Sequence, residues 1–264
     1  MDRLLFLGVG TIASAVRRAL PGLPAVGTTR TAPDQRFRAI SPIAAHDVMA
    51  IRLAAQGANV VVSFPPDGSS DRAWSELVTG ATSIAYLSST AVYPSTGVVT
   101  ECSNVGGSGE RAALRLAAEQ LWLDAGASVV RLPAFYGLTT GLHVSLARGT
   151  FRMPNSGSNI VSRVHEDDAA RFVRAALRAP PRSLLLAGDD KPCPVVEVVH
   201  FVSALFGLAL PVSVAGEQIP LSLRASRTVD NRVTKVSHAI QLTYPTYREG
   251  YQAIYEQRHR PTEA

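Results

Sequence analysis

Cysteine is scarce in this chain of 264 residues. Its two cysteines, Cys102 and Cys193, lie far apart in the sequence. Two separated thiols exclude a cysteine-rich metal box and the disulfide framework of a small secreted domain. We therefore predict no metal site and a reducing, cytoplasmic setting.

Long apolar runs are also missing. No uninterrupted apolar segment reaches the roughly 18 residues that a membrane-spanning helix requires. The first residues enter an apolar stretch directly, without the basic segment and apolar core of an export signal. We therefore expect neither a membrane partner nor an export signal.

Lysine is rare, although the chain is basic. Lys191 and Lys235 are its two lysines, so the other 24 of its 26 cationic residues are arginines, and the formal net charge is +5. The arginines are spread along the chain without a run of five or more. This distribution argues against a nucleic-acid groove. It is typical of solvated helix faces, with one or two arginines left to bind phosphate.

The segment at 3–13, RLLFLGVGTIA, contains the clearest motif. A short apolar run ends in Gly8 and Gly10 and continues into a helix-like stretch, as in a dinucleotide-binding turn. Gly8 would allow the tight turn, Gly10 would let the backbone approach a pyrophosphate, and Ala13 would keep the helix close to the sheet. Phosphate would then bind at the helix N-terminus, together with Thr11 and Ile12.

Strand and helix patterns alternate along the rest of the chain. With 46% hydrophobic residues, the chain can form one large α/β domain, or one domain with a small added lobe. The alternation predicts a doubly wound parallel sheet with right-handed crossovers. We predict strands at 25–29, 37–40, 59–64, 83–88, 128–132 and 183–187, helices at 11–20, 46–56, 70–78, 110–124, 166–179, 194–206 and 247–257, and a long loop at 90–109.

Several segments, in this order, cover almost the whole chain. They read GVGTIA, SSTAVYP, RLPAFYG, RVHEDDAARFVRAAL, and VDNRVTK with TYPTYREGY. Together they resemble the atypical, extended end of the short-chain dehydrogenase/reductase superfamily, the NAD-dependent epimerase/dehydratase group. The resemblance implies a Rossmann domain at 1–190, with 138–164 inserted into the substrate cleft, and a small C-terminal substrate lobe at 191–264.

The residues after the second strand bear on the choice of cofactor. An NAD site usually has an acid there for the ribose 2′-hydroxyl, whereas a cation accommodates a 2′-phosphate. This chain has Thr29 and Arg30 and no acid, so NADP(H) is predicted, with Arg36 and Arg38 as helpers and NAD as the alternative. The remaining predicted cofactor contacts are Ser63, Phe64, Pro65, Ser88, Arg115 and Pro133.

The resemblance also implies a catalytic set, from which this chain departs. The hydroxyl position falls on Ser89, but the family's Tyr-x-x-x-Lys pair aligns with Arg111 and Arg115. A guanidinium stays protonated at working pH, so Arg111 cannot exchange a proton. Tyr93, Tyr136 and His143 are the candidate replacements for the missing acid. Arg115 can still hold ribose or phosphate.

Three functions remain open from the sequence. The first is an NADP(H)-dependent oxidoreductase acting on a small cytoplasmic metabolite. The second is an isomerase or lyase of the epimerase/dehydratase type, and the third is a cofactor-binding sensor without turnover. Either a monomer or a homodimer is compatible with the sequence. The predicted substrate contacts, which suit an anionic small molecule, are Thr90, Arg111, Asn231 and Arg232.

Overall fold

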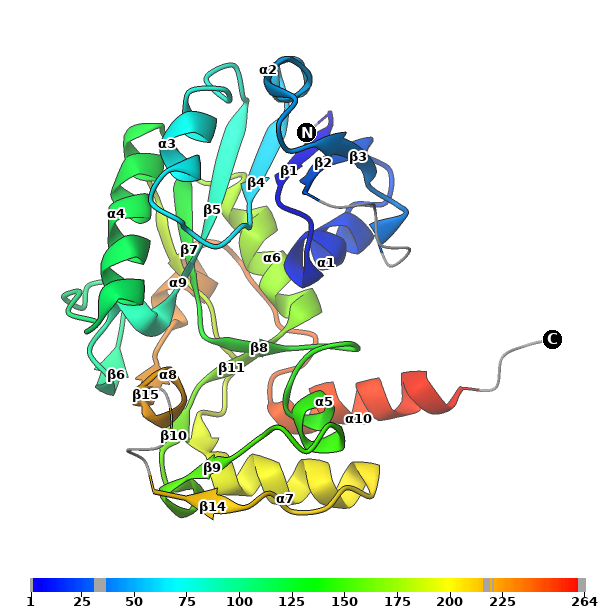
Figure 1. The fold of residues 1–264 in the computed structure, drawn as a ribbon, viewed down its shortest axis with the longest axis vertical. Helices are drawn as coiled ribbons and strands as arrows, with labels where there is room; N and C mark the ends of the chain where they lie inside the picture. The colour runs from blue at the N-terminus through cyan, green and yellow to red at the C-terminus, as the bar shows by residue number, and fades with distance from the viewer. Residues whose placement is uncertain (1, 31–36, 216–218, 220, 261–264) are drawn as a thin grey trace.

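A seven-stranded sheet forms the centre of the molecule (Figure 1). The computed structural model describes residues 2–30, 37–215, 219 and 221–260. Neighbouring strands all run parallel in the order β12-β7-β5-β4-β1-β2-β3. The predicted Rossmann sheet is therefore confirmed. The strands are β1 (Leu4–Leu7), β2 (Ala25–Thr29), β3 (Ser41–Ala44), β4 (Asn59–Val62), β5 (Ser83–Ser89), β7 (Ser128–Leu132) and β12 (Leu184–Leu186).

Helices cover both faces of this sheet. Along β1, Leu4 and Phe6 pack into one apolar cluster and Leu5 and Leu7 into another, as the two-residue period of a strand requires. The first cluster includes α1 (Thr11–Ala19) and α6 (Glu166–Ala176). The second lies under α2 (Val48–Ala55), α3 (Ser70–Ser75) and α4 (Glu110–Asp124). A strand buried on both faces explains the continuous apolar run LLFL.

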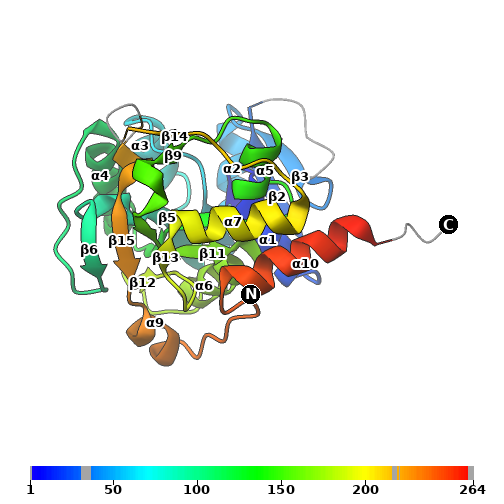
Figure 2. The same cartoon turned by 90° about the horizontal axis from the view of Figure 1, so that it is seen from below.

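A smaller part lies beyond the carboxyl ends of the central strands (Figures 1 and 2). Its four-stranded sheet has the order β13-β10-β15-β6. These strands are β6 (Thr96–Val99), β10 (Ile160–Val161), β13 (Cys193–Pro194) and β15 (Ser226–Val229). Its helices are α5 (Leu142–Ala147), α7 (Val195–Phe206), α8 (Leu221–Arg224) and α10 (Tyr247–His259). A further short helix, α9 (Arg232–Ser237), lies beside β12 of the central sheet. Two short parallel pairs complete it: β8 (Ala134–Tyr136) with β11 (Arg163–His165), and β9 (Met153–Pro154) with β14 (Ser213–Val214).

The long loop predicted at 90–109 contains ordered elements. A 3-10 turn, η2 (Thr90–Val92), is followed by β6, which pairs in parallel with β15. Residues from the first half of the chain therefore form part of the smaller sheet. The domain boundary at residue 190 stays a prediction.

The third strand begins later than predicted. We expected it at 37–40, but Ser41–Ala44 pair with Val26–Thr29 instead. Ile40 is buried in the core cluster, which explains the apolar signal just before the strand. Pro42 suits this position because β3 is an edge strand and can lack one N–H donor.

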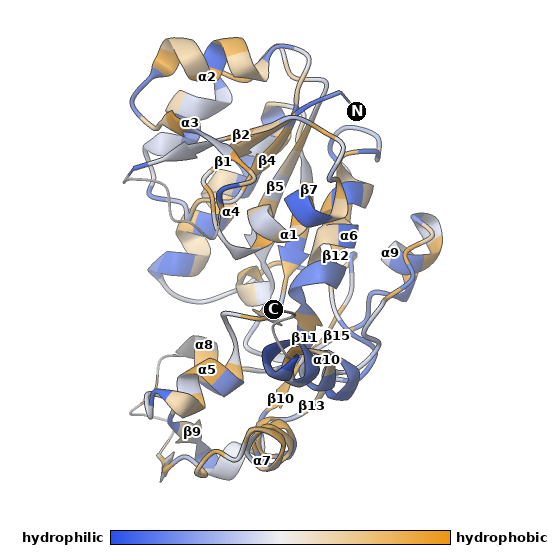
Figure 3. Ribbon diagram, turned by 90° about the vertical axis from the view of Figure 1, so that its right-hand side faces the viewer, coloured by the Kyte–Doolittle hydropathy of each residue, from blue (hydrophilic) through white to orange (hydrophobic). Residues whose placement is uncertain are grey.

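Figure 3 shows a contrast between two helices of the smaller part. The helix α7 is mainly hydrophobic, whereas α10 is mainly hydrophilic. Tyr247, Tyr251 and Ile254 of α10 nevertheless pack with Val198 and Val202 of α7 in one apolar cluster. Among the residues described above, no helix is both long enough and apolar enough to cross a membrane.

Candidate functional site

The glycine turn after β1 is held between two neighbouring strands. Gly8 has a φ of +88°, and its N–H donates to Thr28 Oγ1 at 2.8 Å. Its carbonyl accepts from Ser63 Oγ at 2.7 Å. A Cβ on Gly8 would lie 3.0 Å from the backbone nitrogen of Phe64. Both the backbone angle and the close contact therefore require glycine here.

Gly10 precedes α1 and has open space beside it. It is the N-cap of the helix, with extended backbone angles and no side-chain cap. A Cβ placed on Gly10 would meet no atom within 4 Å. The free N–H groups and dipole of the helix N-terminus favour an anion at such a place. This opening fits the approach of a pyrophosphate.

One cavity lies on the β2 side of the turn, and we call it the Arg30 cavity. Its volume is about 570 Å³. The aromatic side chains of Phe37, Phe64 and Trp74 contribute to its wall, and Arg30 and Asp67 supply opposite charges. Arg38 does not line it, and Arg36 lies outside the described residues.

A second cavity, the Ser89 cavity, lies on the β5 side and measures about 340 Å³. It shares Gly10 and residues 63–65 with the Arg30 cavity, so the two adjoin at the glycine turn. Both lie at the carboxyl ends of parallel strands, where ligands bind in open α/β sheets. Apart from Arg38, the predicted cofactor contacts of the described chain line one cavity or the other: Gly8, Gly10, Thr11, Ile12, Thr29, Arg30, Ser63, Phe64, Pro65, Ser88, Arg115 and Pro133.

Ser89 lines the Ser89 cavity at the end of β5. Its Oγ accepts from the N–H of Ala91 at 3.2 Å, and this acceptor role leaves the hydroxyl proton available to a ligand. Arg115 also lines the cavity, and its Nη1 donates to the carbonyl of Leu87 at 3.0 Å. The predicted substrate contact Thr90 is buried and does not line the cavity.

Beneath Ser88 lies a buried ion pair that the sequence reasoning missed. Ser88 donates to Glu119 Oε1. Arg131 holds both oxygens of Glu119, with Nε to Oε1 at 3.0 Å and Nη2 to Oε2 at 2.7 Å. Both charged side chains are almost fully buried. An arginine inside the apolar strand sequence SVVRL was the available signal, because a buried arginine requires a partner.

Tyr93 belongs to the same network and lies outside the cavity, contrary to its predicted catalytic role. Its hydroxyl accepts from Arg131 Nη1 at 2.8 Å and donates to the carbonyl of Thr100 at 3.0 Å. The side chain is fully buried, and desolvation raises the pKa of Tyr93. Its place in the packing keeps the Tyr93 side chain away from the Ser89 cavity.

The two other candidates for the missing acid are also buried away from the Ser89 cavity. Tyr136 stacks on Tyr251 with ring centroids 4.5 Å apart, and burial raises the pKa of Tyr136 far above its usual value. His143 stacks on Phe206, and desolvation lowers the pKa of His143 to about 4. Both side chains form the apolar interior of the smaller part. Neither of these predicted catalytic side chains therefore lines the Ser89 cavity.

The remaining predicted substrate contacts do not meet at the cavities. Arg111 is exposed on the first turn of α4. Asn231 is buried, and its amide donates to the carbonyl of Gly188 at 3.0 Å. Arg232 is exposed and pairs with Asp230. These last two belong to the start of α9, which is anchored at the outer strand β12 by a Leu186–Thr234 hydrogen bond and lies outside the sheet (Figure 3).

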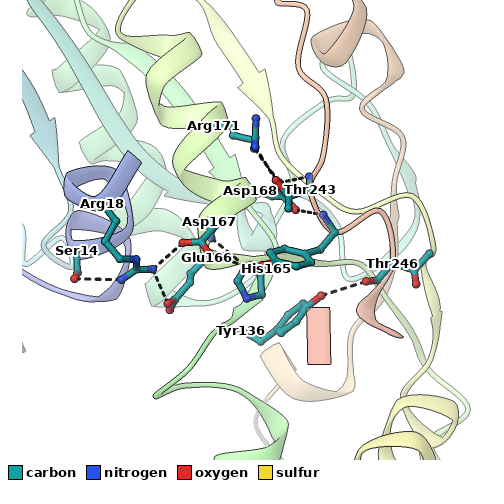
Figure 4. A network of polar contacts seen from close by, with 11 residues as sticks. Ser14, Arg18, Tyr136, His165, Glu166, Asp167, Asp168, Arg171, Thr243 and Thr246 are labelled. Carbon is teal, nitrogen blue, oxygen red and sulfur yellow. Dashed lines mark hydrogen bonds and ion pairs between the residues drawn. The ribbon is translucent and has the colours of Figure 1, made fainter. Parts of the chain in front are cut away.

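A third cavity of about 480 Å³ lies between α1, α6 and α10 and is lined by a polar network (Figure 4). Arg18 Nη2 donates to Glu166 Oε1 at 2.8 Å and to Asp167 Oδ1 at 2.7 Å. His165 Nδ1 accepts the N–H of Asp167, which caps α6. Asp168 accepts the N–H groups of residues 243 and 244. The network ties α1 and the C-terminal segment to the start of α6.

Comparison with solved structures gives many matches across nearly the full chain. A functionally unknown conserved protein from Silicibacter pomeroyi is 26% identical, with a TM-score of 0.84 and coverage of 97% of this chain and 99% of that one. The UDP-glucose 4-epimerase of Thermotoga maritima is 14% identical, with a TM-score of 0.80 and coverage of 97% and 98%. DesIV of Streptomyces venezuelae, a dTDP-glucose 4,6-dehydratase solved with NAD and TYD, is 15% identical, with a TM-score of 0.80 and coverage of 98% and 98%.

These similarities define the class of fold. No family model and no curated protein matches the sequence. Several of the structural neighbours are epimerases or dehydratases, some of them solved with NAD, and this chain shares their fold over nearly its whole length. The similarity concerns the fold, and the reactions and substrates of these neighbours are properties of those proteins alone.

Proposed function

We propose that this chain is an NADP(H)-dependent oxidoreductase that acts on a small anionic metabolite. The supporting observation is the pair of adjoining cavities on either side of the Gly8–Gly10 turn. Together they offer an extended path past the N-terminus of α1, and a dinucleotide is an extended ligand with a central pyrophosphate. The open space beside Gly10 at the N-terminus of α1 also suits the pyrophosphate of a dinucleotide.

The preference for NADP(H) rests on Arg30. It follows β2 directly and lines the Arg30 cavity with Thr28 and Thr29, so the end of that strand carries a cation and no acid. A guanidinium can form paired, charge-assisted hydrogen bonds to a phosphate. A 2′-phosphate near Arg30 is therefore stabilised, whereas a bare 2′-hydroxyl loses the carboxylate partner that NAD sites provide.

In the Ser89 cavity, Ser89 and Arg115 carry the chemistry. The nicotinamide of the bound cofactor would supply or accept a hydride. The Ser89 hydroxyl donates a hydrogen bond to the substrate oxygen or nitrogen. Arg115 stabilises negative charge that develops there, because its guanidinium is a cation with several N–H donors. An anionic group on the substrate is favoured by the same cation.

The residues that line the Ser89 cavity limit which groups can supply a proton. Among the described residues that line the Ser89 cavity, none carries an acid or base that titrates near neutral pH. The proton therefore comes from water or from the substrate itself. Ser88 cannot replace the missing acid, since its hydroxyl proton is committed to the ion-paired Glu119.

The same observation favours a second candidate function, a cofactor-binding sensor without turnover. Tyr93, Tyr136 and His143 are all buried outside the cavity. The epimerase or dehydratase alternative rests on structural neighbours that were solved with NAD, two of them together with a nucleotide sugar. An isomerase would retain its cofactor without net oxidation, and a sensor would bind cofactor but turn over no metabolite.

Calorimetric titration with NADPH and, separately, NADH tests the proposal. We expect micromolar binding of NADPH and at least tenfold weaker binding of NADH. Arg30→Ala should reduce this preference below threefold. The control is Arg52→Ala, because Arg52 is exposed on α2 and lines neither cavity. No binding of either nucleotide contradicts the proposed function, whereas equal affinities contradict the role of Arg30.

A further inference from the structure

The Arg30 cavity is electrically polarised. Arg30 enters it after β2, and Asp67 enters it from the segment after β4. Phe37, Phe64 and Trp74 also line it, and Phe64 and Trp74 meet edge to face with centroids 4.7 Å apart. A cavity with aromatic side chains and two opposite charges in its wall suits a flat ring that carries both an anionic group and hydrogen-bond donors.

Asp67 is held in place by its own turn. Its Oδ1 accepts the N–H of Ser69 at 3.0 Å and of Ser70 at 2.7 Å, while its Oδ2 accepts the Ser70 hydroxyl at 2.6 Å. The Ser70 hydroxyl and these backbone donors lower the pKa of Asp67 to about 2. The carboxylate therefore stays negative throughout the pH range of interest.

The bonding of the two oxygens leaves a free acceptor. Oδ1 also lies 3.3 Å from the Ser69 hydroxyl, so among the described residues it has three donors, whereas Oδ2 has one. A carboxylate oxygen can accept two hydrogen bonds, so Oδ2 retains a lone pair for a ligand. A permanent anion repels phosphate and attracts an N–H donor.

We infer that Asp67 recognises the 6-amino group of the adenine ring and so selects adenine over 6-oxopurines. This inference rests on the proposed binding of NADP(H). The 2′-phosphate favours a cation as its neighbour, and the 6-amino group favours an anion. Arg30 and Asp67 supply these two charges. A 6-oxopurine presents a carbonyl oxygen at the same position, which would face the carboxylate without a hydrogen atom between them.

A single change of the ligand tests the inference. Deamino-NADPH carries hypoxanthine in place of adenine and is otherwise NADPH. Calorimetric titration of the full chain should show at least tenfold tighter binding of NADPH, since a hydrogen bond to a charged group is lost and two acceptors oppose each other. Energy transfer from tryptophan to the reduced nicotinamide gives a second readout of binding, and Trp74 lines the Arg30 cavity itself.

Asp67→Asn is the matched variant. Its amide oxygen can still accept the N–H groups of Ser69 and Ser70, so the turn is retained. Its amide nitrogen can donate to the 6-oxo group. The preference for NADPH should therefore fall below threefold in this variant. Asp124→Asn, on α4 and bonded to Gln120, lies outside the cavity and should keep the full preference.

Each result has a defined meaning. Equal binding of the two nucleotides by the wild-type chain overturns the inference but leaves the proposed function intact. A preference that survives in Asp67→Asn overturns it as well, because another group then recognises the base. Equal weakening of both nucleotides by the variant assigns Asp67 to the ribose, which also contradicts the inference. No binding of either nucleotide overturns the proposed function together with the inference.

Discussion

Replacing Asp189 with asparagine is expected to remove a pH-dependent loss of stability. Asp189 lies between β12 and β13, where the chain passes from the central sheet to the smaller part. The residue is only 3% exposed, and within the described part of the chain neither carboxylate oxygen has a hydrogen bond of good geometry. Desolvation raises the pKa of Asp189 to about 7, and the charge of Arg163 and the backbone N–H groups of Lys191 and Arg163 oppose this rise only in part.

The sign of the effect follows from the two pKa values. In the unfolded chain an aspartate has a pKa of about 3.9. Between that value and about 7, the folded state keeps a proton that the unfolded state releases, so the free energy of unfolding falls as pH rises. The loss begins near pH 4 and is complete above pH 7. A shift of about three pKa units corresponds to about 4 kcal/mol, of which about 2–3 kcal/mol falls between pH 5 and pH 8.

Urea unfolding of the wild type and Asp189→Asn at pH 5, 6, 7 and 8 measures this difference. Relative to the wild type, the variant should gain about 2–3 kcal/mol from pH 5 to pH 8. The test is how this difference in the free energy of unfolding changes with pH. Asparagine also buries an amide, which shifts the free energy of unfolding of the variant by a similar amount at every pH. Asp190→Asn is the control, since Asp190 is half exposed and paired with Lys235. Parallel curves for the wild type and Asp189→Asn would refute the reasoning, because Asp189 would then titrate normally.

Three further predictions concern the candidate site. Ser89→Ala should lower turnover at least tenfold once a substrate is known, while NADPH affinity stays within twofold; equal loss of both would make Ser89 structural. Glu119→Ala leaves Arg131 buried without its partner and should lower the free energy of unfolding in urea by about 3–5 kcal/mol. A loss below about 1 kcal/mol would mean that water replaces the carboxylate. Gly8→Ala places a side chain on a left-handed backbone and against Phe64. It should lower the free energy of unfolding by about 1–3 kcal/mol and weaken NADPH binding at least tenfold. Unchanged binding by calorimetry would mean that the glycine turn takes no part in the cofactor site.

The central sheet could be predicted because its signals are local. Each buried strand is a short apolar run, and each crossover helix has its own periodicity and terminal residues. The third strand was misplaced because Ile40 is buried outside the strand, and an apolar residue carries the same signal in either place. β6 was missed for a different reason. It is an exposed strand whose partner, β15, is more than a hundred residues away in the sequence.

The cofactor contacts and the catalytic candidates had different outcomes for a physical reason. Gly8, Gly10 and Arg30 lie at strand ends, and in a parallel sheet those ends share one edge. The sheet topology alone therefore brings these residues close together. By contrast, Tyr93, Tyr136 and His143 can fill a core or face a ligand with equal ease, because each has an apolar body and a polar end. Their burial depends on what packs against them.

The sequence by itself determined the parallel sheet, the glycine turn and the cation after β2, because each depends on the local chain or on a topological rule. Only the tertiary structure decided which side chains reach the cavities. Glu119 and Arg131 meet across α4 and β7, and Asp67 and Arg30 enter one cavity from segments after different strands. Such pairings depend on distances between segments that are remote in the sequence. Side-chain packing sets those distances, and no local pattern records them.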